Sequence, residues 1–132
     1  MGLPMWTEFL DNATGIEAVY SGTPPRLESV RIHEVVLAVE SSALKFRIDL
    51  PEYPVKPPKK WAAHGYNTVQ VELYFSGVRD VELSGFCHEI VGDVVLSGGE
   101  VINVEVNSES MRIRATADMV FVSNISAYTD AC

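Results

Sequence analysis

The sequence predicts a mainly β domain of the α+β type, with an antiparallel sheet of about eight short strands after a short N-terminal helical segment. Three observations lead to this prediction. Apolar and polar residues alternate with a period of two along most of the chain after residue 27. Clusters of turn-forming residues separate the alternating stretches, and the earliest apolar residues have helical spacing instead. We expect the sheet to form a sandwich or a partly open barrel.

The helical segment is expected between residues 6 and 20. Trp6, Phe9 and Leu10 have the i, i+3, i+4 spacing that places side chains on one helical face. A second short turn over residues 15–20 repeats this pattern, and the Gly-Thr-Pro-Pro run at 22–25 ends it. Trp6 has apolar neighbours at the edge of an irregular segment, so we expect it to be largely buried.

The first strands are predicted at residues 27–39 and 44–50, which form an antiparallel hairpin. The apolar parity of the first strand switches at His33-Glu34, and this predicts a β-bulge or a sharp bend. In residues 44–50, leucine, phenylalanine and isoleucine alternate with charged side chains, as in a strand with one buried face.

Residues 68–75 and 81–84 are predicted to form the next hairpin. Their six inward apolar residues all have odd numbers, so an antiparallel pair needs a loop with an odd number of residues, such as Gly77-Val78-Arg79. The remaining strands are predicted at 90–96, 101–106, 111–115 and 120–128.

A long connection over residues 51–66 contains four of the seven prolines. We expect extended backbone there, with Trp61 largely buried and holding the loop against the core. The loop has a loose PxxP pattern, but a stiff connection within the domain explains it better than a recognition ligand does. Lys56, Lys59 and Lys60 form the only basic run, which is typical of a solvated loop.

Length and charge restrict the classes of function. A chain of 132 residues forms one domain, so residues 1–132 are treated as a single unit. The net charge of −8 argues against nucleic acid or an anionic membrane as partner and favours a basic protein. No apolar run is long enough for a membrane span, and the first residues lack the features of an export signal. With Cys87 and Cys132 suited to a reducing compartment, we expect a cytoplasmic protein.

The residues that could carry chemistry do not form a recognisable motif. His33, His64, Cys87 and His88 are the candidates, but no CxxC, HxH or HExxH pattern contains them. No nucleophile elbow or glycine-rich phosphate loop is present either. We therefore expect no metal site, no cofactor and no catalytic residues. Two alternatives stay open, a β-barrel that binds a small apolar ligand and a small enzyme that uses Cys87 or His33.

Charge is distributed unevenly along the chain. Residues 26–60 contain seven basic and five acidic residues, whereas residues 61–132 contain three basic and ten acidic ones. Several acids of the second part have outward positions in the predicted strands, with a tyrosine among them. They predict an acidic face that binds a basic partner, although an ordinary solvated face has the same pattern. The candidate contact residues are Glu72, Tyr74, Asp80, Glu82 and Glu105.

A series of short motifs follows the same order along nearly the whole chain. They are Trp6, Gly15-Ile16, Tyr20, PPRL at 24–27, VRIHEV at 30–35, FRIDLP at 46–51, PPKKW at 57–61, NTVQV at 67–71, VRDV at 78–81 and ISAY at 125–128. In their order and spacing the sequence resembles the immunity protein 50 family, small bacterial proteins associated with polymorphic toxin systems.

The resemblance implies a single immunity-protein-like domain over residues 1–132. It implies a β-rich protein that binds a cognate toxin domain and neutralises it by protein–protein contact, in the cytoplasm, without a cofactor or an active site. The free protein is expected to be a monomer. A toxin that acts on an anionic substrate would have a basic cleft, and this would complement the acidic charge of the chain.

Overall fold

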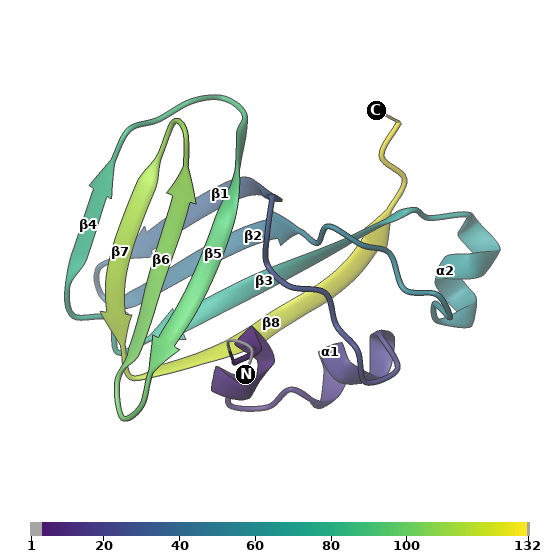
Figure 1. Cartoon of the computed structure of the whole chain (residues 1–132), viewed down its shortest axis with the longest axis horizontal. Coiled ribbons are helices and arrows are strands. Elements are labelled where there is room, and N and C mark those ends of the chain that lie inside the picture. The colour runs from purple at the N-terminus through teal and green to yellow at the C-terminus, as the bar shows by residue number, and fades with distance from the viewer. Residues whose placement is uncertain (1–3, 132) are drawn as a thin grey trace.

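The computed structural model describes residues 4–131, in which eight antiparallel strands form one sheet (Figure 1). The predicted fold class is confirmed, and the sheet is not closed into a barrel. Its strand order is β4-β7-β6-β5-β1-β2-β3-β8. The strands are β1 (Val30–Ala38), β2 (Ala43–Asp49), β3 (Thr68–Ser76), β4 (Val81–Ser84), β5 (Ile90–Gly98), β6 (Ile102–Ser108), β7 (Arg112–Ala117) and β8 (Met119–Tyr128).

The sheet has two four-stranded halves that cross one another, β4-β7-β6-β5 and β1-β2-β3-β8 (Figure 1). Only three residue pairs, from Val30↔Gly92 to Ile32↔Ile90, join β1 to β5. The core lies between the inner faces of the halves. Phe46 and Phe75, both fully buried, meet there edge to face with ring centroids 5.5 Å apart. Burial of these apolar faces provides the main stabilisation of the fold.

The predicted β1–β2 hairpin and its bulge are confirmed. Ile32 pairs with Ile48 and Glu34 with Arg47, so His33 is the extra residue on β1. The bulge accounts for the parity switch in the sequence, because one inserted residue exchanges the two faces of a strand. The alternation predicted for residues 68–75 is confirmed as well, since the odd-numbered positions of β3 are buried.

The predicted hairpin between β3 and β4 is wrong. β3 pairs with β2 and β8, whereas β4 pairs with β7 at the opposite edge of the sheet. The ten-residue β8 gives β3 nine residue pairs, many more than the four-residue β4 can provide. The alternation in the sequence defined the inner face of both strands without defining their partners.

The N-terminal helical segment consists of η1 (Trp6–Phe9) and α1 (Thr14–Val19). η1 packs against β5 and α1 against β8. Trp6 is buried as predicted, and its indole N–H donates a hydrogen bond of 2.8 Å to the carbonyl oxygen of Pro25. Trp6 thereby attaches the start of the chain to the segment that enters β1.

The proline-rich connection differs from the prediction in two respects. It contains a short helix, α2 (Lys59–His64), which projects from the end of the sheet (Figure 1). Trp61 lies on this helix and is half-buried, not largely buried. Its ring packs against Tyr53 of the same connection, with centroids 6.5 Å apart. Because α2 stands away from the inner faces, Trp61 reaches only the margin of the core.

Candidate functional site

The five predicted contact residues lie on two separate parts of the molecule. Glu72 and Tyr74 are on β3, in the half formed by β1, β2, β3 and β8. Asp80 directly precedes β4, Glu82 is within it, and Glu105 is on β6. A single face on one strand pair, as the sequence predicted, is therefore wrong, because β3 and β4 are not neighbours.

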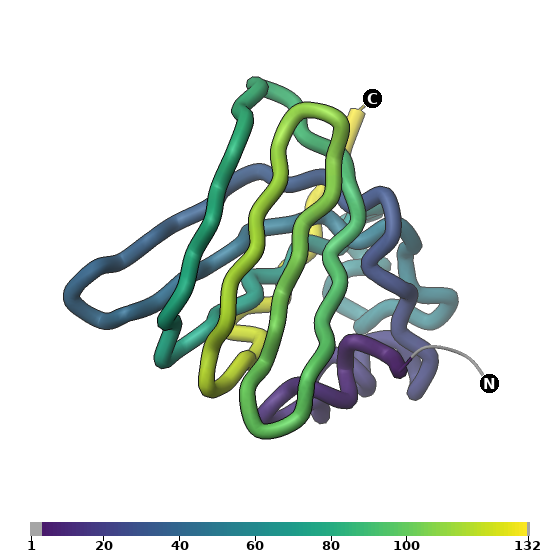
Figure 2. The backbone as a smooth tube through the Cα atoms, turned by 60° about the vertical axis from the view of Figure 1, so that its left-hand side comes forward, coloured from purple at the N-terminus to yellow at the C-terminus, as the bar shows by residue number. Residues whose placement is uncertain are grey.

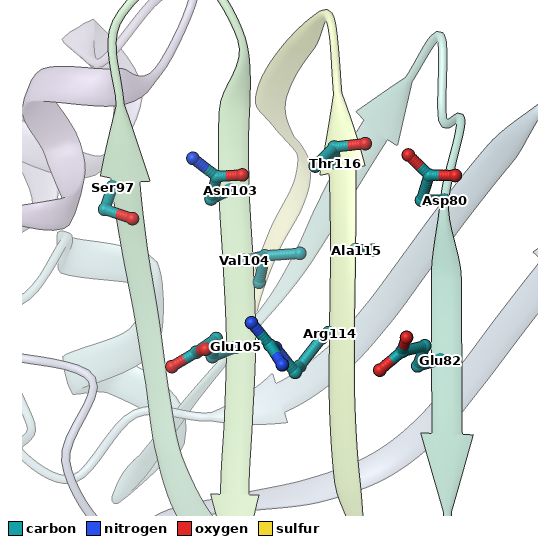
Figure 3. A pocket seen from close by; sticks show the side chains of 9 residues that line it. All are labelled: Asp80, Glu82, Ser97, Asn103, Val104, Glu105, Arg114, Ala115 and Thr116. Atoms are coloured by element: carbon teal, nitrogen blue, oxygen red, sulfur yellow. Dashed lines mark ion pairs between the residues drawn. The ribbon is translucent and has the colours of Figure 1, made fainter.

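The structure brings three of the predicted acids to one outer surface beside β7, the strand that carries Arg114. Glu82 and Glu105 are the residues that pair with Arg114 from the two neighbouring strands, and Asp80 lies beside Thr116 one row further along (Figure 3). These side chains line an open depression of about 330 Å³ on the outer face. We call it the acidic depression, and its lining residues are Asp80, Glu82, Ser97, Asn103, Val104, Glu105, Arg114, Ala115 and Thr116.

The acidic depression carries more negative than positive charge. Arg114 Nε lies 3.3 Å from Glu105 Oε1, which is the one ion pair among the lining residues. Within the described part of the chain, neither Asp80 nor Glu82 has a cationic side chain within 4.0 Å. Both carboxylates are solvent-exposed and accessible to a cationic group of a partner.

The surroundings of Glu72 and Tyr74 are different. Glu72 Oε1 lies 3.9 Å from Lys45 Nζ, and Ser123 Oγ donates to the other carboxylate oxygen at 3.3 Å. The ring of Tyr74 packs against Phe121, with centroids 5.0 Å apart. Negative charge on this outer face is balanced by lysine and arginine of β2. It therefore lacks the excess of carboxylates that distinguishes the acidic depression.

A cluster around Asp49, at the end of β2, was not predicted from the sequence. Asp49 is buried, with Oδ2 2.7 Å from His33 Nε2, and Oδ1 accepts a hydrogen bond of 3.1 Å from Gln70. The phenol of Tyr128 donates a further bond to Oδ2. Burial, then the bond to Asp49 and nearby negative charge, raises the pKa of Tyr128 to about 12. The alternation of apolar and charged residues in 44–50 predicted Asp49 on the outer face. The polar side chains that enclose it come from other strands, so only the folded structure reveals them.

The family model for immunity protein 50 matches residues 12–128, which include α1, α2 and all eight strands. The chain belongs to the immunity protein 50 family. Family membership implies a protein toxin as partner. No curated protein and no solved structure matches this member of the immunity protein 50 family. The match confirms the resemblance seen in the order of the sequence motifs.

The candidate chemical residues of this immunity protein 50 domain are dispersed. His33 is part of the Asp49 cluster, His64 stacks on Tyr66 with centroids 5.1 Å apart, and half-buried Cys87 has its Sγ 4.0 Å from His88 Nδ1. Among the described residues, no three His, Cys, Asp or Glu side chains are grouped to hold a metal ion. Cys132 lies outside the described residues.

Two further observations concern the ligand-binding alternative and the membrane. A ligand-binding barrel requires a closed sheet around a cavity, but this sheet is open and its inner faces pack on one another. Within residues 4–131, no helix has the length and apolar character needed to cross a membrane.

Proposed function

We propose that this immunity protein 50 family member binds a cognate bacterial toxin domain and neutralises it by protein–protein contact. The observation that carries the proposal is the acidic depression, whose lining contains the three carboxylates of Asp80, Glu82 and Glu105 and one cation, Arg114. An immunity protein of this kind needs a surface complementary to its toxin and needs no catalytic residue or cofactor. We further propose that it acts as a monomer in the cytoplasm.

The partner surface that fits the acidic depression is basic. Asp80 and Glu82 are exposed and, among the described residues, have no cationic side chain within 4.0 Å, so a lysine or arginine of the toxin gains charge-assisted hydrogen bonds there. The net charge of −8 adds long-range attraction, which mainly accelerates association. A toxin with a basic, nucleic-acid-binding cleft has this complementary charge, and occupation of the cleft would block its substrate.

Glu72 and Tyr74 are left outside this interface. The carboxylate of Glu72 is already paired with Lys45, and Tyr74 is partly buried, with its ring packed against Phe121. Substitution of either residue is expected to leave toxin binding within about twofold of the unmodified protein, as for a position outside an interface.

The test is a series of association and dissociation rates with the cognate toxin domain. The double variant Asp80→Lys, Glu82→Lys is expected to slow association about tenfold or more and to flatten its dependence on salt. Glu17→Lys, Glu109→Lys makes the same change of charge at exposed sites away from the depression and serves as the control. Equal association rates for the two double variants would contradict the proposed interface.

A further inference from the structure

The second part of β1 is a free strand edge. β1 pairs with β5 only as far as Ile32↔Ile90, and the bulge at His33 follows directly. From Glu34 to Ala38, the pairs recorded in the described structure are with β2 alone. β1 thus separates from β5 part-way along its length, and the β1–β2 hairpin projects past β4 (Figure 2).

β4 provides a second free edge beside the first. It is the terminal strand of the sheet, and among the described residues its only partner is β7. Leu83 pairs with the buried Ile113 and so shares its inner face, yet nothing covers it completely and it is 48% exposed. In most proteins such edges are protected by lysine, proline or a covering segment.

The space between the two edges is an apolar groove. Its wider part, of about 360 Å³, is lined by Val35 and Leu37 of β1 and by Leu83, Phe86 and Cys87 on the other side. A narrower part of about 240 Å³ continues from Leu37 to Val81. Leu37 is 49% and Phe86 86% exposed, so the groove keeps large apolar side chains in water. We call this feature the edge groove. Exposed apolar surface of this kind marks sites of protein contact.

The charge around the edge groove restricts its occupant. Residues 33–40 and 80–89 contain five carboxylates, namely Glu34, Glu40, Asp80, Glu82 and Glu89. Arg79 also lines the narrower part of the groove, but it is paired with Asp118, and Glu34 and Glu89 are paired with cations of β1 and β2. Among the described residues, Glu40, Asp80 and Glu82 have no cationic side chain within 4.0 Å, so the unpaired charge beside the groove is negative. A second copy of this chain would bring the same acidic segments against them, so like charges oppose self-association. A basic segment complements them. β4 also borders the acidic depression through Asp80 and Glu82, so the two surfaces are continuous.

We propose that an extended segment of the toxin domain enters the edge groove and adds to β4 as a further antiparallel or parallel strand. The inference rests on the proposed function, since it names the element by which the toxin binds. Side chains of a strand alternate between its faces. The segment therefore has apolar residues that pack on Leu83 and Leu37, alternating with lysine or arginine that face Asp80 and Glu82.

The experiment measures how tightly the cognate toxin domain binds the unmodified protein and three variants. Leu83→Lys removes an apolar contact and repels a basic segment, so the dissociation constant is expected to rise about tenfold or more. Phe86→Ala is a second variant. Because Phe86 is 86% exposed, this substitution is expected to leave the fold intact. Val55→Lys, at a 97% exposed site in the proline-rich connection, is the matched control and is expected to bind as the unmodified protein does.

Hydrogen exchange of the unmodified protein gives a readout of strand addition. Within residues 81–84, the amides that point away from β7, every second one, are expected to become protected in the complex, because an added strand accepts hydrogen bonds from the free edge. If the complex forms but these amides stay unprotected and Leu83→Lys binds normally, the edge groove is not the docking site and the proposed function stands. Absence of any complex would overturn both proposals. A homodimer that Leu83→Lys dissociates would identify a second copy as the occupant and overturn this one.

Discussion

His33 Nε2 lies 2.7 Å from Oδ2 of Asp49, so the bulged residue of β1 is tied to the end of β2. The same carboxylate accepts hydrogen bonds from Gln70 on β3 and Tyr128 on β8. One buried side chain therefore links all four strands of this half of the sheet.

Asp49→Ala is expected to destabilise the fold by about 2–3 kcal/mol. The substitution leaves the side chains of Gln70 and Tyr128 without their acceptor in a partly buried site, and unsatisfied groups of this kind are costly. Urea unfolding measures the change. Glu34→Ala removes an exposed carboxylate with ion pairs of 3.8 Å and is expected to cost less than about 1 kcal/mol. Equal losses in the two variants would contradict the role of the Asp49 cluster.

Stability is expected to fall as the pH rises from about 10 to about 12. An unfolded tyrosine releases its proton near pH 10, whereas burial holds the pKa of Tyr128 at about 12. Between these values the unfolded state binds fewer protons than the folded state, so the free energy of unfolding decreases with pH, and below pH 10 the stabilisation is complete.

The variant Tyr128→Phe isolates this contribution. Urea midpoints measured between pH 9 and 12 are expected to fall less steeply than those of the unmodified protein. A residual slope is expected because burial, and then Glu52, also raises the pKa of Tyr20. Identical slopes in the two proteins would show that Tyr128 titrates alike in the folded and unfolded states.

Two adjacent glycines in the β5–β6 turn provide a matched pair. Gly98 has φ of +109°, and a Cβ atom there would lie 2.1 Å from the carbonyl oxygen of Val101. Gly99 has open space around the corresponding position. Gly98→Ala is expected to lose roughly 1–3 kcal/mol, whereas Gly99→Ala is expected to stay within about 0.5 kcal/mol. Thermal unfolding of both variants makes the comparison, and a reversed order would contradict the turn geometry.

The two tryptophans are expected to differ in their contribution to stability. Trp6 is buried and hydrogen-bonded to Pro25, so Trp6→Ala is expected to cost about 3–5 kcal/mol. Trp61 is half-buried beside Tyr53, and Trp61→Ala is expected to cost only about 1–2 kcal/mol. Denaturant unfolding of both proteins tests the order. A larger loss at Trp61 would show that α2 packs more closely on the core than described.

Residue alternation predicted the faces of the strands well. The period of two in β2 and β3 assigned their buried side chains, and the parity switch located the bulge at His33. These features are local, since each residue's face follows from its neighbours in the chain.

Strand partners were harder to predict because pairing depends on distant segments. An odd-length loop after β3 is compatible with a β3–β4 hairpin, but β8 competes for the same edge and offers more pairs. Because of this wrong pairing, the predicted contact residues were placed on one face, whereas Tyr74 and Glu82 belong to different halves of the sheet. The edge groove could not be predicted from the sequence for the same reason, since it forms where β1 separates from β5 after Ile32.

The most direct test of the central claim is protection of bacterial growth. The cognate toxin domain is expressed together with the unmodified protein or with the variant Asp80→Lys, Glu82→Lys. The account predicts that the unmodified protein restores growth and co-purifies with the toxin as a stable complex, and that the variant, although folded, does neither at equal expression. Growth arrest and no complex with the unmodified protein would contradict the account.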